Sequence, residues 1–169
     1  MIGAGMTSQI VPFHTLLIKR LSAPTTAEVQ RLLTSVGELE QNVADHATTG
    51  GFMMAQHYPK ASIVRLAVGD FGLGIPATLR LSGKSYATDS AAIIDAVRPT
   101  TTSTNEAVRG FGLHFLRRDV VDVLGGTLVI ASGGGRVTWA RGQLTPIDSG
   151  SSQMTGTLVA AHIPTGGTP

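Results

Sequence analysis

The sequence predicts a single α+β domain in which helices and a strand meander form a two-layer sandwich. Three observations lead to this prediction. The chain has 169 residues, the length of one ordinary domain, and hydrophobic residues make up 42% of it. Helical and strand periodicities follow one another in the order strand, helix, strand, long loop, helix and three strands. Helices that lie between strands and precede a run of strands are typical of one helical layer packed on one sheet.

The N-terminal half of the chain contains two predicted strands and one long helix. The short apolar run Phe13–Lys19 predicts the first strand. The capping box Thr25-x-x-Glu28 then begins a helix, which we expect to end near residues 47–49, before Gly50-Gly51. The apolar stripe of this helix consists of Val29, Leu32, Leu33, Val36, Val43 and Ala47. The alternating segment Ile63–Val68 predicts the second strand.

The C-terminal half begins with a long loop and ends with strands. Residues 71–110 are rich in Gly, Ser and Thr and contain one weak helical patch at Ser90–Val97. Apolar spacing over Leu113–Leu124 predicts a second amphipathic helix, which Gly125-Gly126 ends. The remaining predicted strands are 127–131, 137–140 and 158–163.

The composition excludes several classes of function. The chain has no Cys and therefore no disulfide, thiol chemistry or Cys-ligated zinc. Its net charge is +2 and its longest basic run is Arg117-Arg118, which argues against a nucleic-acid partner. No apolar run approaches the roughly 18 residues of a membrane span. Residues 1–18 also lack the Lys or Arg of a secretory signal, so we expect a cytoplasmic protein.

The first helix carries a group of polar residues. At about 100° per residue, Glu38, Asn42 and Asp45 lie within roughly 60° of one another, and His46 lies beside them. Two interpretations remain open at this point. The group is a solvated helix face, or it is a carboxylate and an amide that orient a water molecule and hold a hard cation through oxygen atoms.

Two glycine clusters follow predicted elements. Asp70-x-Gly72-x-Gly74 follows a strand, and a carboxylate there can accept a hydrogen bond from an exocyclic amine; the same pattern also occurs in simple turns. The segment Arg109–Leu113 leads into the second helix. Free N–H groups at a helix N-terminus bind anions such as phosphate, to which Arg109 adds charge; an ordinary helix start is the alternative.

Taken in order, these segments resemble the GHKL ATP-binding superfamily, which includes DNA gyrase, heat-shock chaperones, mismatch-repair ATPases, histidine kinases and anti-sigma-factor serine kinases. The N box of that superfamily resembles residues 38–47, and its first glycine box resembles Asp70–Ile75. Its second glycine box resembles Gly110–Leu113, and its closing Gly-Thr pair resembles Gly156-Thr157. The resemblance covers residues 13–164, which leaves 1–12 as an N-terminal extension and 165–169 as a tail.

The resemblance implies a role for each matching residue at the adenine end of a nucleotide site. Asp70 is similar to the acceptor of the adenine amine, and Thr157 assists through its hydroxyl. Gly72 and Gly74 resemble the turn that admits the adenine, and Ile75 follows that turn.

At the phosphate end, the resemblance makes Asn42 the Mg²⁺ ligand and Glu38 the catalytic base. Residues 76–109 resemble the ATP lid, and Gly110 and Gly112 its phosphate-facing hinge. The other residues that the boxes place near the nucleotide are Asp45, His46, Arg109, Phe111 and Leu113.

The implied fold is the Bergerat sandwich, a mixed and mostly antiparallel sheet with helices on one face. The implied function is a Mg²⁺-ATP-binding catalytic module for phosphotransfer to a partner protein in bacterial signalling, such as two-component signalling. Two alternatives remain: an anti-sigma-type regulatory module that binds a sigma or anti-anti-sigma-like factor with little turnover, and an autonomous ATPase. The N box does not separate these alternatives, and a homodimer remains open. The meander over residues 126–139 most resembles histidine kinases.

Overall fold

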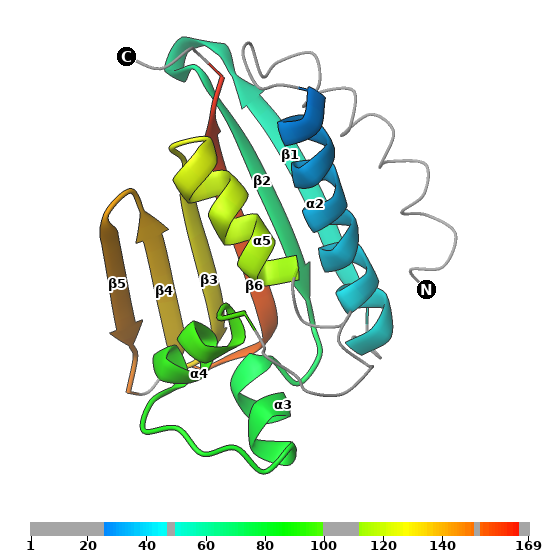
Figure 1. Ribbon diagram of the computed structural model, residues 1–169. Helices are drawn as coiled ribbons and strands as arrows, with labels where there is room; N and C mark the ends of the chain where they lie inside the picture. The colour runs from blue at the N-terminus through cyan, green and yellow to red at the C-terminus, as the bar shows by residue number, and fades with distance from the viewer. Residues whose placement is uncertain (1–25, 47–49, 100–111, 151–152, 166–169) are drawn as a thin grey trace.

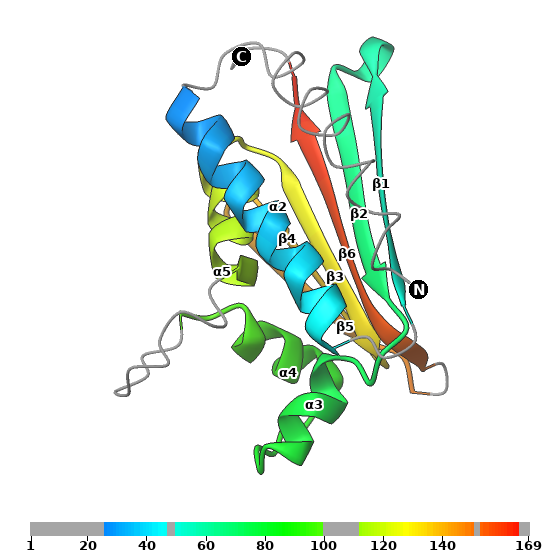
Figure 2. The same cartoon turned by 90° about the vertical axis from the view of Figure 1, so that its right-hand side faces the viewer.

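The computed structural model describes residues 26–46, 50–99, 112–150 and 153–165; within the first helix, residues 26–29, 42 and 44–46 are described by their backbone alone. The described chain forms two layers, a six-stranded sheet and a group of helices that covers one face of it (Figures 1 and 2). This arrangement confirms the predicted α+β sandwich.

The sheet has the strand order β1-β2-β6-β3-β4-β5. Every described pair of neighbouring strands is antiparallel, so the parallel pair of an expected mixed sheet is not found among these strands. The strands are β1 (Gly51–Tyr58), β2 (Ile63–Asp70), β3 (Thr127–Gly133), β4 (Gly135–Ala140), β5 (Gln143–Asp148) and β6 (Met154–Pro164).

The helices of the described chain lie on one side of the sheet (Figure 2). They are α2 (Thr26–His46), α3 (Ile75–Leu81), α4 (Asp89–Ala96) and α5 (Gly112–Arg117), which continues as the π-helix η2 (Arg118–Val123); a 3-10 turn η1 (Pro59–Ala61) joins β1 to β2. Asp119 of η2 is buried, with its Oδ1 2.7 Å from Arg118 Nη2 and its Oδ2 3.5 Å from Ser35 Oγ of α2. None of the described helices is long and apolar enough to span a membrane.

The core lies between α2 and the central strands. Leu32, Val36 and Val43 are buried as the predicted apolar stripe requires, because residues at spacings of three and four share one helix face. Opposite them, β2 alternates buried and more exposed residues, with its buried side chains Val64, Leu66 and Val68 facing the helices.

Several sequence predictions need correction. The predicted order of elements omits β1, β5 and α3. β1 contains no β-branched residue and lies at the sheet edge, so it lacks the usual strand composition. β5 is exposed along its whole length and contains Pro146, although a two-residue turn separates it from β4. The start of α3 carried a signal that was missed, since Pro is favoured in the first turn of a helix.

Other predictions agree with the structure. The long first helix, the strand after it, the helical patch before residue 98 and the last predicted strand correspond to α2, β2, α4 and β6. The helix predicted over residues 113–124 is present, but half of it is π-helical. The strand predicted at Phe13–Lys19 lies outside the described residues.

Candidate functional site

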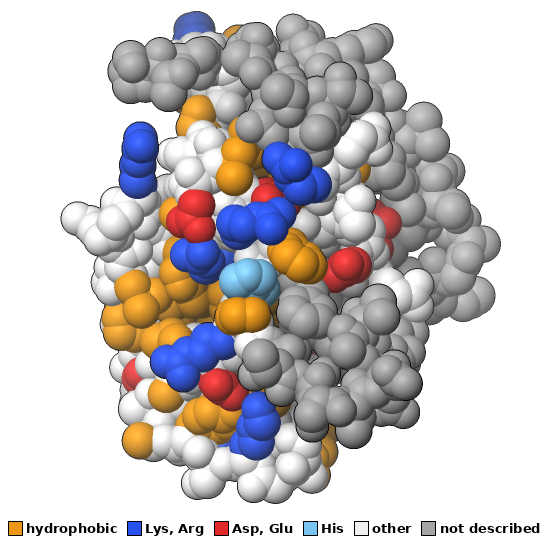
Figure 3. All heavy atoms as spheres, in the orientation of Figure 1, with side chains coloured by type: hydrophobic (Ala, Val, Ile, Leu, Met, Phe, Trp, Pro, Cys, Tyr) orange, Lys and Arg blue, Asp and Glu red, His pale blue; other side chains and the backbone are white. Residues whose placement is uncertain are grey.

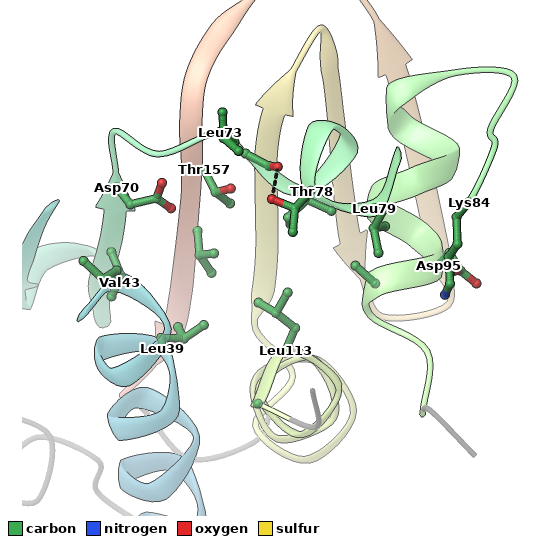
Figure 4. Close-up of a pocket in the computed structure, with 16 residues that line it drawn as sticks. Leu39, Val43, Asp70, Leu73, Thr78, Leu79, Lys84, Asp95, Leu113 and Thr157 are labelled. Atoms are coloured by element: carbon green, nitrogen blue, oxygen red, sulfur yellow. Dashed lines mark hydrogen bonds and ion pairs between the residues drawn. The ribbon is translucent and has the colours of Figure 1, made fainter. Parts of the chain in front are cut away.

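A cavity of about 430 Å³ opens on the helix side of the sheet, where β2 ends (Figure 4). Its floor is formed by β2 and β6, and its walls by α2, α3 and the loop before it, α4 and the loop before it, and α5. Most of its lining side chains are apolar: Leu39, Val43, Val68, Leu73, Ile75, Leu79, Ala96, Leu113 and Val159. An apolar cavity of this size with a few polar groups is typical of a site for a small organic ligand.

Asp70 is the carboxylate at the sheet end of this cavity. It follows Gly69, which pairs with Leu158 of β6, so Asp70 and Thr157 lie on neighbouring strands at one end of the sheet (Figure 4). The Asp70 Oδ1 atom accepts a hydrogen bond of 2.7 Å from the Gly72 backbone N–H. Among the described residues Oδ2 has no hydrogen-bond partner. The turn therefore fixes the carboxylate and leaves one oxygen for a ligand donor.

Gly156 allows β6 to approach Asp70 closely. Its φ is +81°, in the left-handed region, and a Cβ atom built there would lie 1.9 Å from the Asp70 carbonyl oxygen and 3.0 Å from Asp70 Oδ1. Any other residue would displace the carboxylate. Gly74 has a similar role, since its φ is +80° and a Cβ atom would lie 2.6 Å from Ser132 Oγ. Of the predicted glycines, Gly74 of the turn and Gly156 of the closing Gly-Thr pair are thus required by geometry.

Ser132 connects the segments around Asp70, and sequence reasoning missed it. This fully buried residue of β3 accepts a hydrogen bond of 2.9 Å from the Ile75 backbone N–H and donates one of 2.8 Å to the Gly156 carbonyl oxygen. Its Oγ also lies 3.1 Å from Thr157 Oγ1. The one available signal was its place at the end of a strand beside the turn Gly133–Gly135.

The hydrogen bonds of Ser132 determine whether the Thr157 hydroxyl donates or accepts hydrogen bonds. A hydroxyl has one proton, and Ser132 gives its proton to Gly156, so Thr157 must donate the hydrogen bond between the two side chains. The remaining lone pairs of Thr157 Oγ1 then accept hydrogen bonds. Asp70 and Thr157 together present only acceptors to the cavity, which favours a ligand edge with N–H donors.

Glu38 lies where α2 and α5 are in contact. A Cβ atom built on Gly112 would lie 2.7 Å from Glu38 Oε2 and 3.0 Å from Glu38 Cβ, so the glycine permits this close approach of the two helices. The polar face of α2 at this point is therefore packed against α5 and is not a freely solvated surface. Gly112 and Leu113 line the cavity, which places Glu38 beside its wall.

The structure brings six of the predicted residues into the lining of one cavity: Asp70, Gly74, Ile75, Gly112, Leu113 and Thr157. Gly72 contributes its N–H to Asp70. The side chains of Asn42, Asp45 and His46, and the whole of Arg109, Gly110 and Phe111, lie outside the described residues. The described part of the chain holds no cluster of three or more His, Cys, Asp or Glu side chains that could bind a metal.

Lys84 of the predicted lid lies at the cavity in an ion pair that was not predicted. Lys84 and Asp95 both line it, and Lys84 Nζ lies 3.1 Å from Asp95 Oδ2. The Tyr86 hydroxyl donates a 2.5 Å hydrogen bond to the same carboxylate oxygen. The hydrogen bonds from Tyr86 and Lys84 lower the pKa of Asp95, and the bond to Asp95 raises the pKa of Lys84. Both groups therefore stay charged across the neutral pH range.

Comparisons with known proteins give likenesses among solved structures alone. No protein-family model and no curated protein sequence matches the chain. The catalytic domain of histidine kinase ThkA superposes with a TM-score of 0.49 and 15% identity, covering 98% of this chain and 93% of that chain. A histidine kinase domain from the blue-light activated kinase of Erythrobacter litoralis superposes with a TM-score of 0.40 and 19% identity. The 43K ATPase domain of Thermus thermophilus gyrase B, in complex with an aminocoumarin, gives 0.43 and 21%.

The last two superpositions cover 82% and 78% of this chain but only 45% and 33% of the other chains. All three TM-scores are below 0.5 and all three identities are 21% or less, so the fold and the chemistry of the site are argued from this chain's own residues.

Proposed function

We propose that this chain is a Mg²⁺-ATP-binding module of the GHKL type, in which the adenine enters the cavity beside Asp70. One observation carries the proposal. The Asp70 carboxylate, fixed by the Gly72 N–H, presents one free oxygen to an apolar cavity. Beside it lies the Thr157 hydroxyl, whose proton is donated to Ser132. An adenine offers the matching chemistry, because it has two apolar faces and an exocyclic amine that donates hydrogen bonds.

The size and lining of the cavity also suit a purine. About 430 Å³ is within the range of small-molecule sites, and aliphatic side chains from α2, α5 and β6 line it, against which a ring can pack. Burial of such a ring removes apolar area from water, which supplies affinity, while the acceptors Asp70 and Thr157 supply orientation.

The phosphate end is assigned from the resemblance and from the position of Glu38. Mg²⁺ binds oxygen ligands and usually takes one or two from the protein, with phosphate and water supplying the others. Asn42 would be the protein ligand. Bound ATP supplies the phosphoryl group, while Glu38, held against Gly112 by the packing of α2 on α5, would orient and accept the proton of the attacking hydroxyl.

The acceptor is proposed to be a side chain of a partner protein, so the chain acts as the catalytic module of a signalling kinase. Lys84, the one cation among the described residues of the cavity lining, is available to compensate phosphate charge. Its partner Asp95 then remains hydrogen-bonded to Tyr86.

Ligand-dependent thermal unfolding tests the adenine site. ATP with Mg²⁺ at about 100 times its Kd should stabilise the wild-type chain by roughly 2.7 kcal/mol. Asp70→Asn should reduce this shift strongly, because the variant replaces an acceptor oxygen with a donor at nearly equal volume. The matched control is Asp122→Asn on η2, whose carboxylate faces Arg117 in a surface ion pair. An equal shift in Asp70→Asn and wild type would contradict the proposal.

The same samples test the catalytic role. Glu38→Gln should keep the ATP-dependent shift and lose roughly 10²–10⁴-fold in turnover, which is the usual contribution of a general base. Retained binding with unchanged turnover would remove Glu38 from catalysis. Retained binding with no measurable turnover in wild type or variant would favour the regulatory binding module.

A further inference from the structure

The face of the sheet turned away from the helices differs from the rest of the molecule in its charges. Strand alternation assigns to it the residues 52, 54, 63, 65, 67 and 69, and their cross-strand partners on β6, β3, β4 and β5. We call this surface the outer face. No acidic side chain among the described residues belongs to it. The helix side instead shows basic and acidic groups next to one another (Figure 3).

The outer face carries uncompensated positive charge. Arg65 on β2 and His162 on β6 are directly paired across the strands, and Arg136 lies on β4. All three side chains are exposed, and none has a carboxylate partner in the described chain. The Arg65 guanidinium lies 4.7 Å from the centre of the Tyr58 ring. Burial and the neighbouring Arg65 charge lower the pKa of His162. The standing positive charge is therefore that of Arg65 and Arg136, and a carboxylate of a partner bound beside Arg65 would favour protonation of His162.

The outer face is also apolar between these charges. Phe52 and Met54 of β1 are 39% and 62% exposed. Small or aliphatic residues that are partly exposed continue the surface across the sheet: Ala67, Leu158, Ala160, Val129 and Ala131. None of the described helices covers them (Figure 2). An exposed apolar surface bordered by polar residues is typical of an interaction site.

We propose that the outer face binds an acidic amphipathic helix of another protein, with its apolar stripe on the small residues and its carboxylates at Arg65, Arg136 and His162. Six strands spaced by about 4.8 Å span roughly 24 Å, and a helix of about 18 residues is ~27 Å long, so one helix crosses the sheet.

The charges favour this occupant over the other candidates. A second copy bound through the same face would bring basic groups against basic groups. Residues 1–25 of this chain contain Lys19 and Arg20 and no Asp or Glu, so they cannot supply the carboxylates. Binding to anionic lipid uses clusters of about four to eight Lys or Arg, and the outer face offers two Arg.

Two designed peptides of about 18 residues test the proposal with the full chain. Both carry the same Leu stripe, flanked by Glu in one peptide and by Lys in the other. The Glu peptide should shift backbone amide resonances of β2, β6 and β3 and raise the pKa of His162, and the Lys peptide should do neither. Arg65→Glu with Arg136→Glu should weaken binding of the Glu peptide by about tenfold or more.

The matched control is Arg31→Glu with Arg117→Glu, which makes the same change of charge on the helix side and should leave peptide binding unchanged. ATP binding should be the same in all variants, so a failure here is distinct from a failure of the proposed function. Equal binding of both peptides, or equal losses in the two double variants, would overturn the proposal. Two other results would also overturn it. One is that the chain dimerises and Met54→Glu abolishes the dimer. The other is that the chain binds phosphatidylglycerol vesicles and needs Arg65 and Arg136 to do so.

Discussion

The two ends of the cavity are held by different interactions. At the Asp70 end, the Ser132 hydroxyl joins β3, β6 and the start of α3 through buried hydrogen bonds. Gly156 of β6 lies so close to the Asp70 backbone that no Cβ atom fits between them. At the other end, Lys84 and Asp95 form an ion pair whose side chains are 51% and 30% exposed. The first end depends on short-range packing, and the second on charges that water and salt screen.

This difference indicates how each end responds to change. Buried hydrogen bonds and steric contacts hold one geometry, so we expect the Asp70 end to be formed before a ligand arrives. An exposed ion pair contributes little to stability, so Lys84 can leave Asp95 for a ligand anion at small cost. Substitutions should accordingly reduce stability and binding more at the Asp70 end than at the Lys84–Asp95 end.

The largest effect is expected at Gly156. Gly156→Ala introduces a left-handed alanine, which costs about 1–2 kcal/mol, and a Cβ atom 1.9 Å from the Asp70 carbonyl oxygen, which adds roughly 1–3 kcal/mol. Gly142→Ala is the matched control, because Gly142 has a φ of +71° and no atom within 4 Å of a built Cβ. Urea unfolding should show a greater loss for Gly156→Ala, with loss of ATP binding. Equal losses would show that β6 does not confine Asp70.

A moderate and selective effect is expected at Ser132. Ser132→Ala leaves the Ile75 N–H and the Gly156 carbonyl without their partner, at a cost of about 1–3 kcal/mol in unfolding free energy. It also frees the Thr157 proton, which can then turn to a 6-oxo group. The preference for ATP over ITP should fall roughly 3- to 10-fold.

The control for selectivity is Ser35→Ala, because Ser35 is also buried but lies on α2, bonded to the Arg31 carbonyl oxygen at 3.1 Å. This variant should lose stability and keep the nucleotide preference. Calorimetric titration with both nucleotides separates the two effects. An unchanged ratio in Ser132→Ala would mean that Ser132 supports the fold without setting the polarity of Thr157.

The same contrast explains what the sequence revealed. The Asp70 turn was predictable because its glycines stand at fixed spacings and follow an alternating strand. Ser132 was not, because its role arises from a cross-strand contact between residues 25 apart, Ser132 and Thr157, that leaves no local pattern. The Lys84–Asp95 pair was missed for the same reason: two charges 11 residues apart in a polar segment meet only because α4 folds back.

The fold shows the same limit at the sheet edges. Buried strands such as β2 and β6 alternate clearly, since one face must be apolar. β1 and β5 are edge strands, each paired with one neighbour only. Their residues face solvent more than the core, so they lack a clear apolar alternation. The helix α2 was predicted almost to its last residue because its stripe of buried side chains is long.

The smallest effect is expected at the Lys84–Asp95 pair. Asp95→Asn should change the free energy of unfolding by about 0.2–1 kcal/mol, since both side chains are partly exposed. The pKa of Asp95 is lowered in the folded chain, so its contribution is complete above the ordinary value of 3.8 and is lost as pH falls through the folded pKa. The pKa of Lys84 is raised, so its contribution is complete below 10.5 and is lost as pH rises through the folded pKa.

Unfolding of wild type and Asp95→Asn at low and high salt tests the ion pair. The difference in unfolding free energy between wild type and Asp95→Asn should shrink as salt rises, whereas the difference between wild type and Ser132→Ala should stay constant. A salt-independent difference in Asp95→Asn would show that the two ends of the cavity are held alike.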